Sequence, residues 1–233
     1  EQTGRPVGQQ FGYVTDGFFS QEDVEKYAIN KGMEGGIPDH NFSPKAGDVK
    51  YRDLNGDYKI DDKDVAAIGY PKYPLLTGNM SLGFSWNGLD FSMVWSGAFK
   101  TSRLVSSFYR VPFDTTNNRA LLSYMIKDAW TPEKGDSSTA PAISFGASKA
   151  NNYKDSDLWL RDASYVRLKN IELGYSFPKQ IVKKMHLGTL RLSVSGYNLL
   201  TFDDMGFCDP ESNPDGQAYP LIKVVNFGLK VGF

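Results

Sequence analysis

The feature that most constrains this sequence is strict alternation of apolar and polar residues in several segments, most clearly at positions 225–233. One parity of this segment carries Val225, Phe227, Leu229, Val231 and Phe233, and the other carries Asn226, Gly228, Lys230 and Gly232. Successive side chains of a β-strand point to opposite faces of its sheet. The segment therefore predicts one strand with an apolar face and a polar face.

The same alternation recurs on both sides of Asn87-Gly88, over residues 76–86 and 89–95. Asn-Gly between two alternating segments is the strongest short signal for a β-hairpin. Further alternating segments lie at 171–177 and 190–194, and a weaker strand is expected near residues 9–15. The sequence thus predicts an all-β fold of antiparallel strands.

The expected connections alternate between short and long. Asn87-Gly88 is minimal, and residues 178–187 are a short helical turn for which Pro178 suits the first position. The long connections cover residues 16–73, 99–162 and 201–219. Such loops are uncommon in compact soluble domains, whereas outer-membrane barrels alternate short periplasmic turns with long external loops.

Two helices are expected inside the long connections. Ser20 with Asp23 forms a plausible cap before a helix over residues 21–28. Asn117 or Asn118 is expected to cap a second helix that runs to Asp128.

This pattern leaves two fold classes open. In a transmembrane barrel all short turns lie at the periplasmic end, where an aromatic girdle would contain Trp86, Trp95, Tyr175, Phe177 and Phe233. The alternative is a soluble β-sandwich that buries its aromatic face, and the pattern alone favours the barrel only modestly. About six strands are expected, and bacterial barrels close with about eight or more, so a barrel would need further strands.

Composition excludes several function classes. A net charge of −1 argues against broad electrostatic binding to nucleic acid or to an anionic membrane face. The lone Cys208 excludes a disulfide scaffold and a cysteine-based zinc cluster. Because neither a nucleophile motif nor a glycine-rich phosphate loop is found, we expect no enzyme activity, no organic cofactor and no nucleic-acid partner.

An aspartate-rich segment matches the spacing of a calcium-binding loop. The predicted ligands are Asp53, Asn55, Asp57, the backbone carbonyl of Lys59, Asp61 and Asp64. Tyr58 stands where such loops need glycine, and the last ligand is an aspartate in place of the usual glutamate. The alternative is a polar turn stabilised by aspartate and asparagine hydrogen bonds, and both interpretations stay open.

Charged residues on the polar parity form a separate candidate set. They are Arg161, Arg167, Lys169, Glu172, Arg191 and Lys230. In a barrel some of these side chains would line the lumen, although salt bridges between neighbouring strands are the favoured interpretation. A basic cluster at residues 179–186 is interpreted as a solvated face, with Lys179, Lys183, Lys184 and His186 as its members.

Five segments together resemble SusC/RagA-type TonB-dependent outer-membrane transporters. They are GDVKYRDLNGDYKIDDKD (47–64), SYVRLKNIELGYSFP (164–178), LRLSVSGYNLLTF (190–202), DPE (209–211) and FGLKVGF (227–233). The resemblance implies that residues 1–233 are the C-terminal part of one β-barrel domain of about 22 strands, without the plug domain that fills the lumen.

The resemblance also implies a function and partners. The family imports nutrients, glycan oligosaccharides or peptides, across the outer membrane of Gram-negative bacteria. Its members work with a SusD-like surface lipoprotein, and TonB–ExbB–ExbD acts on the plug. The remaining partners expected are the rest of the same transporter and outer-membrane lipids.

Two site roles follow for the external loops. The resemblance makes Asp209, Pro210 and Glu211 a loop-fixing element, and this is favoured over acid–base chemistry because no catalytic partner accompanies the carboxylates. Aromatic loop residues could stack on sugar rings, although packing of the loops or contact with the lipoprotein is favoured. These candidates are Phe108, Tyr109, Trp130, Tyr153 and Trp159.

The end of the chain suggests a role in assembly. Outer-membrane insertion machinery reads terminal aromatic strands, so Phe227, Leu229, Val231 and Phe233 are predicted to form an assembly signal. The competing hypothesis from another class is a soluble, extracellular, calcium-stabilised β-sandwich module that binds carbohydrate.

Overall fold

The computed structural model describes residues 3–114, 120–206, 208–212, 219 and 221–233. These residues form two compact units, one built mainly of residues 3–72 and 102–161 and the other of 73–101, 162–212 and 221–233. We call the first the loop unit and the second the sheet unit.

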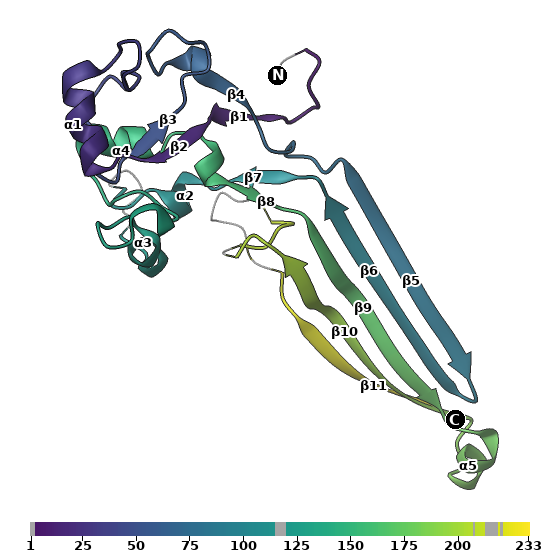
Figure 1. Ribbon diagram of the computed structural model, residues 1–233. Coiled ribbons are helices and arrows are strands. Elements are labelled where there is room, and N and C mark those ends of the chain that lie inside the picture. Colours follow the sequence, from purple (N-terminus) through teal and green to yellow (C-terminus); the bar gives the residue numbers. More distant parts are fainter. Residues whose placement is uncertain (1–2, 115–119, 207, 213–218, 220) are drawn as a thin grey trace. The chain divides into compact units, whose positions relative to one another are not determined.

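The sheet unit is one antiparallel sheet of five strands in the order β11-β10-β9-β6-β5 (Figure 1). Its strands are β5 (Leu76–Trp86), β6 (Leu89–Phe99), β9 (Tyr165–Ser176), β10 (Thr189–Asp203) and β11 (Val224–Gly232). The predicted hairpin, the two middle strands and the terminal strand are all confirmed.

The β5–β6 connection has the geometry that its sequence predicts. Asn87 and Gly88 both have positive φ, 48° and 87°, as a type I′ turn requires. Trp86 therefore pairs with Leu89 next to the turn. Trp95 pairs with Met80 instead, six residues along β6 from Leu89 and about 20 Å from the turn. Its predicted place in the aromatic rim beside the turn is wrong.

The two faces of this sheet differ in chemistry. Register places one row of apolar side chains across all five strands, and these side chains are largely exposed. The row includes Phe84, Phe91, Leu173, Val194 and Phe227. A β-sandwich would cover this face with a second sheet, and the described part of the sheet unit contains none.

The described part of the loop unit holds three two-stranded sheets, and the first two of them are antiparallel. They pair β1 (Gln10–Tyr13) with β4 (Val65–Ile68), β2 (Thr15–Phe18) with β3 (Val49–Tyr51), and β7 (Ser102–Leu104) with β8 (Leu160–Asp162). Val49, Tyr51 and Ile60 form a buried core cluster there. The weak strand expected near residues 9–15 exists as β1, but it does not join the long sheet, which has five strands rather than about six.

The helices are short. They are α1 (Gln21–Asn30), α2 (Ser107–Arg110), α3 (Ser123–Asp128), α4 (Gly146–Asn152) and α5 (Lys179–Lys184), with 3-10 turns η1 (Asp62–Asp64), η3 (Gly135–Ser137) and η4 (Asp157–Trp159). Ser20 and Asp23 form the predicted capping box of α1. Within the part of the chain that is described, no helix is long and apolar enough to cross a membrane.

The second predicted helix is shorter than expected. Asn117 and Asn118 lie outside the described residues. α3 begins only at Ser123 and has no side-chain hydrogen bond at its N-terminus.

Candidate functional site

The aspartate-rich loop begins with a carboxylate that organises the turn. Asp53 accepts backbone N–H bonds from Asn55, Gly56 and Tyr58 at 3.2, 2.7 and 2.6 Å. Asp57 accepts the backbone N–H of Lys59 at 3.1 Å. These are the short-range hydrogen bonds by which aspartates close turns on their own backbone.

The far end of the loop is anchored in the core. Asp64 is fully buried and accepts the backbone N–H groups of Leu54 and Asp61 at 2.8 and 2.9 Å. Ile60 packs in the core cluster, as the apolar position of such a loop should. Asp64 therefore ties the beginning of the loop to its end.

Tyr58 adopts the backbone conformation that the loop demands of glycine. Its φ is 61°, in the left-handed region that β-carbon-bearing residues avoid. The calcium-loop pattern correctly predicts that the backbone at this position is left-handed. Tyrosine adopts this conformation with steric strain, which glycine would not have.

The aspartate-rich loop carries side chains of the type that binds calcium. Calcium prefers six to eight oxygens, and the side chains of this loop are carboxylates and an amide. Among the residues that the structure describes, however, no group of three or more acidic, His or Cys side chains is arranged to hold a metal. The hydrogen bonds found are those of the polar-turn alternative, and the calcium site stays a prediction.

The aromatic candidates for substrate stacking are largely engaged in packing. Trp159 is buried and its indole Nε1 donates to the backbone carbonyl of Asn152 at 2.9 Å. The ring of Tyr153 lies 5.4 Å from that of Trp159, and burial raises the pKa of Tyr153. The ring of Trp130 lies where a β-carbon on Gly47 would clash with it.

Phe108 and Tyr109 are in edge-to-face contact, with their ring centroids 5.0 Å apart. These contacts are those of the loop-packing interpretation. The substrate roles of all five aromatic residues remain predictions.

A bulge in β9 gathers a charged cluster on the polar face. Along β6, Val94 pairs with Asn170 and Trp95 pairs with Leu168, so Lys169 is the extra residue. Arg167, two residues before it, is 1% exposed. A bulge of this kind re-aims side chains, and here it brings two cations to the same loop segment.

The cluster fixes the predicted DPE element. Arg167 Nη2 donates to Asp209 Oδ2 at 2.7 Å, and its Nη1 lies 2.9 Å from Glu211 Oε2. Lys169 Nζ reaches Glu211 Oε2 at 2.7 Å, and Tyr165 Oη donates to Oε1 at 2.7 Å. Burial alone would raise the pKa of Glu211, but the bonds from Lys169 and Tyr165 hold it below its ordinary value.

A second charged cluster bridges three strands. Arg191 Nη2 donates to Asp90 at 2.5 Å and to Glu172 at 2.8 Å. Gly174 provides space for the Arg191 side chain, because a β-carbon at this position would overlap the guanidinium group. This second cluster matches the favoured interpretation that polar-face charges bridge strands, whereas the first cluster joins β9 to the loop segment 209–211.

His40 has no role among the sequence-based predictions, yet it is buried in the loop unit. It is 3% exposed, with the rings of Phe19, Tyr27 and Tyr51 around it. Its Nδ1 lies 2.8 Å from the carbonyl of Pro38, and its Nε2 accepts the backbone N–H of Tyr51 at 3.0 Å. Burial lowers the pKa of His40 to about 4. The rings of Phe19, Tyr27 and Tyr51 come from distant positions, so the sequence around His40 gives no signal for this burial.

Comparison with known proteins gives consistent relatives. TonB-dependent receptor P3 of Formosa agariphila is 26% identical over 249 aligned residues, which cover 99% of this chain and 22% of that protein. TonB-dependent receptor SusC of Bacteroides thetaiotaomicron is 25% identical over 225 residues, covering 95% of this chain and 20% of that protein. No family model matches the chain.

Solved structures share the fold. The RagAB peptide importer in its open-open state superimposes with a TM-score of 0.65 at 18% identity, covering 97% of this chain and 22% of that chain. A second structure of the RagAB peptide transporter gives a TM-score of 0.66.

The chain spans about a fifth of the length of these relatives. The exposed apolar face and the open edges of the sheet agree with a segment of a larger membrane-embedded wall. The chain is similar in sequence to SusC-type TonB-dependent receptors over nearly its whole length, and it has the fold of a segment of a TonB-dependent transporter β-barrel.

Proposed function

We propose that the protein containing this chain imports nutrients across the outer membrane of a Gram-negative bacterium by a TonB-dependent route. The observation that carries the proposal is the division of the five-stranded sheet into an exposed apolar face and a polar, ion-paired face. In a barrel wall these two faces meet hydrocarbon and the aqueous lumen. The chain contributes wall and external loops, and the reaction is transport rather than bond breaking.

The partners follow from the same assignment. The rest of the receptor completes the wall and supplies the plug, on which TonB–ExbB–ExbD acts. A SusD-like lipoprotein closes the external side over the loop unit. The cargo is a glycan oligosaccharide or a peptide, and loop aromatics meet it. Phe113 and Phe145 offer an exposed stacked ring pair with centroids 5.5 Å apart.

The aspartate-rich loop adds a structural cation to this proposal. Calcium would be held by carboxylate oxygens of Asp53, Asp57, Asp61 and Asp64 with the amide oxygen of Asn55 and the carbonyl of Lys59. Its role would be to stiffen an external loop, since none of these side chains belongs to a catalytic constellation. Calorimetry on chelated protein tests this, and absence of uptake at millimolar calcium would refute it.

The terminal strand is proposed to act in assembly. Deleting Phe233 should lower the amount of receptor in the outer membrane, because β11 would lose the terminal aromatic residue that insertion machinery reads. Unchanged amounts of receptor at the cell surface would count against this role.

The decisive experiment for transport uses the intact protein in its own cell. Deletion of its gene should abolish growth on a subset of oligosaccharides or peptides, and deletion of tonB should abolish growth on the same subset. Peptides of residues 1–233 should be found in outer membranes, within a polypeptide several times larger than 26.0 kDa. A lone, detergent-free species of about that mass would refute the proposal and favour the soluble module.

A further inference from the structure

The turn between β9 and β10 carries apolar side chains that point into open space. Val182 is the buried residue of α5, so it fixes which side of the helix faces the sheet unit. Ile181 and Met185, four residues apart and therefore on one side, are 46% and 53% exposed. Two large apolar side chains exposed side by side indicate that this turn contacts something other than water.

The same turn is strongly basic without local compensation. Lys179, Lys183, Lys184 and His186 are all exposed. The sequence contains no Asp or Glu from Leu173 to Phe202. In the described parts of the chain, the ion pairs found do not include these lysines.

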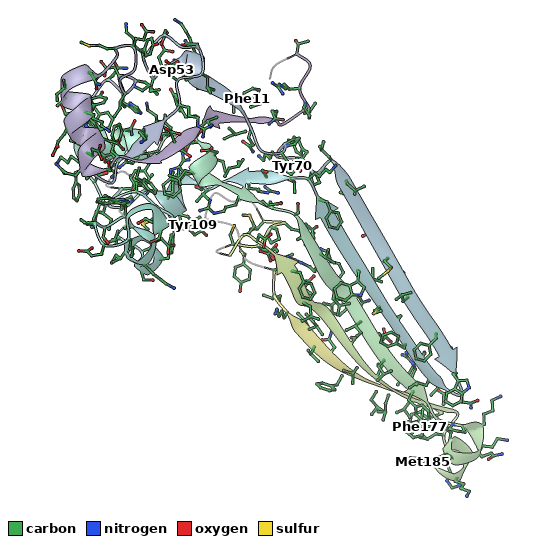
Figure 2. The ribbon with its side chains drawn as sticks, viewed as in Figure 1. Phe11, Asp53, Tyr70, Tyr109, Phe177 and Met185 are labelled. Carbon is green, nitrogen blue, oxygen red and sulfur yellow. The ribbon has the colours of Figure 1, made fainter. Side chains whose placement is uncertain are left out.

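The turn is fixed to the end of the sheet where the apolar face stops. Gly188 donates its backbone N–H to the carbonyl of Gly232 at 2.7 Å, and Phe177 donates to that of Leu190 at 2.9 Å. Figure 2 shows Phe177 and Met185 together at this end, and Figure 1 places α5 beside the end of β11. Trp86, 70% exposed, ends β5 at the β5–β6 turn.

From these observations we infer that α5 and its flanking turn bind the headgroups of anionic phospholipids at the membrane surface. Exposed aliphatic side chains enter the boundary between headgroups and acyl chains, while lysine ammonium groups stay beside the phosphates. A phosphodiester accepts charge-assisted hydrogen bonds from ammonium donors. Aromatic side chains at the same end are typical of the membrane interface.

A bilayer explains the surface better than an acidic protein does. The exposed apolar face of the sheet continues along β11 from Phe227 through Leu229 to Val231, which pairs with Leu190 next to this turn, so one apolar medium would cover both. The overall charge of −1 is compatible with this, because the attraction is local and falls off within a Debye length. The inference rests on the membrane placement proposed above and names the lipid that this end selects.

The test uses the full-length receptor in nanodiscs of phosphatidylcholine that contain phosphatidylglycerol, with retained lipid counted by native mass spectrometry. The parent should retain phosphatidylglycerol selectively. The triple variant Lys179→Gln, Lys183→Gln, Lys184→Gln should lose about 10- to 100-fold of that selectivity, since each surface lysine contributes severalfold to anionic-lipid affinity. The matched triple Lys26→Gln, Lys45→Gln, Lys127→Gln removes equal charge from exposed lysines of the loop unit and should keep it.

The outcomes are separable. The inference would be overturned if the parent and both variants showed equal selectivity, or if both variants lost it. Displacement of the retained phosphatidylglycerol by inorganic phosphate or by an acidic protein would also overturn it. Selective retention of lipopolysaccharide at these lysines would overturn it too, because it would place the turn on the outer leaflet. If the receptor is absent from outer membranes, the proposed function fails; if it inserts without selecting phosphatidylglycerol, only this inference fails.

Discussion

His40 makes the loop unit sensitive to acid. Its neutral ring has both nitrogens satisfied, and a proton on Nε2 would remove the acceptor for the backbone N–H of Tyr51. The pKa is lowered from 6.5 to about 4 by burial. A lowered histidine pKa means that the unfolded state takes up protons first, so the stabilisation is complete above pH 6.5 and is lost as the pH falls towards 4.

We therefore expect the loop unit to lose about 3 kcal/mol of unfolding free energy between pH 6.5 and pH 4, at 1.36 kcal/mol per pKa unit. The measurement is hydrogen exchange of the Tyr51 amide in the intact receptor, corrected for intrinsic rates. His40→Gln should show weaker protection that no longer varies in this interval. Protection of the parent amide that stays constant from pH 7 to 4 would contradict the prediction.

Tyr58 holds a strained backbone conformation inside the predicted calcium loop. Its φ of 61° costs a residue with a β-carbon about 1–2 kcal/mol, whereas glycine adopts it freely. Tyr58→Gly should therefore raise the unfolding free energy of the loop unit by about 1–2 kcal/mol. Hydrogen exchange of the loop amides in the intact receptor measures this gain, with Tyr58→Ala as the variant that keeps the strain and should show none. Equal protection of these amides in the parent and in Tyr58→Gly would contradict the prediction.

Ion pairs between Arg167, next to the β9 bulge, and the carboxylates of Asp209 and Glu211 hold the DPE segment against β9. We call this group of ion pairs the clasp. Arg167 is buried against Asp209 and Glu211, so its removal leaves two carboxylates facing each other without a buried cation. Breaking a buried pair in this way costs about 3–5 kcal/mol. Arg167→Met should therefore release residues 208–212 from β9.

Limited proteolysis of the intact receptor measures this release as faster cleavage within residues 208–212. The matched control is Arg52→Gln, because the Arg52–Asp16 pair is exposed on both sides and such pairs contribute about 0–1 kcal/mol. Cleavage of Arg167→Met at the rate of the parent would show that the clasp does not hold this segment.

The elements that the sequence predicted well are those with local signals. Alternation defines the five long strands, Asn87-Gly88 defines a turn, and Ser20 with Asp23 defines a cap, because each depends on residues that are neighbours in the chain. The β9 bulge has no such signal. It shifts the register by one residue and depends on pairing with two other strands.

The site was less predictable for the same reason. Arg167 and Asp209 are 42 residues apart in the chain, and the pattern of one segment does not encode such a contact or the burial of Trp159 and His40. The misplacement of Trp95 was different. Alternation predicts its parity correctly, but parity carries no information on distance from the turn, and Trp95 lies six residues along β6 from Leu89.

The sheet as a whole presents unpaired edges at β5 and β11 among the described strands. Five strands are fewer than the roughly eight with which membrane barrels begin, and an open edge with exposed apolar residues favours aggregation unless other strands cover it. The sheet is therefore stable only as part of a larger wall, which agrees with relatives about five times as long.

Neighbouring residues of β11 provide a matched test of that wall. Phe227 is 82% exposed on the apolar face, and Asn226 beside it pairs with Ser195 on the polar face. Arginine on the lipid face of a barrel costs about 2–4 kcal/mol near the bilayer centre, whereas lumen positions tolerate charge. Phe227→Arg should strongly reduce the folded, heat-modifiable receptor in outer membranes, and Asn226→Arg should leave it nearly unchanged. Equal losses would mean that the two faces do not meet different media, and the membrane assignment of this sheet would then have to be abandoned.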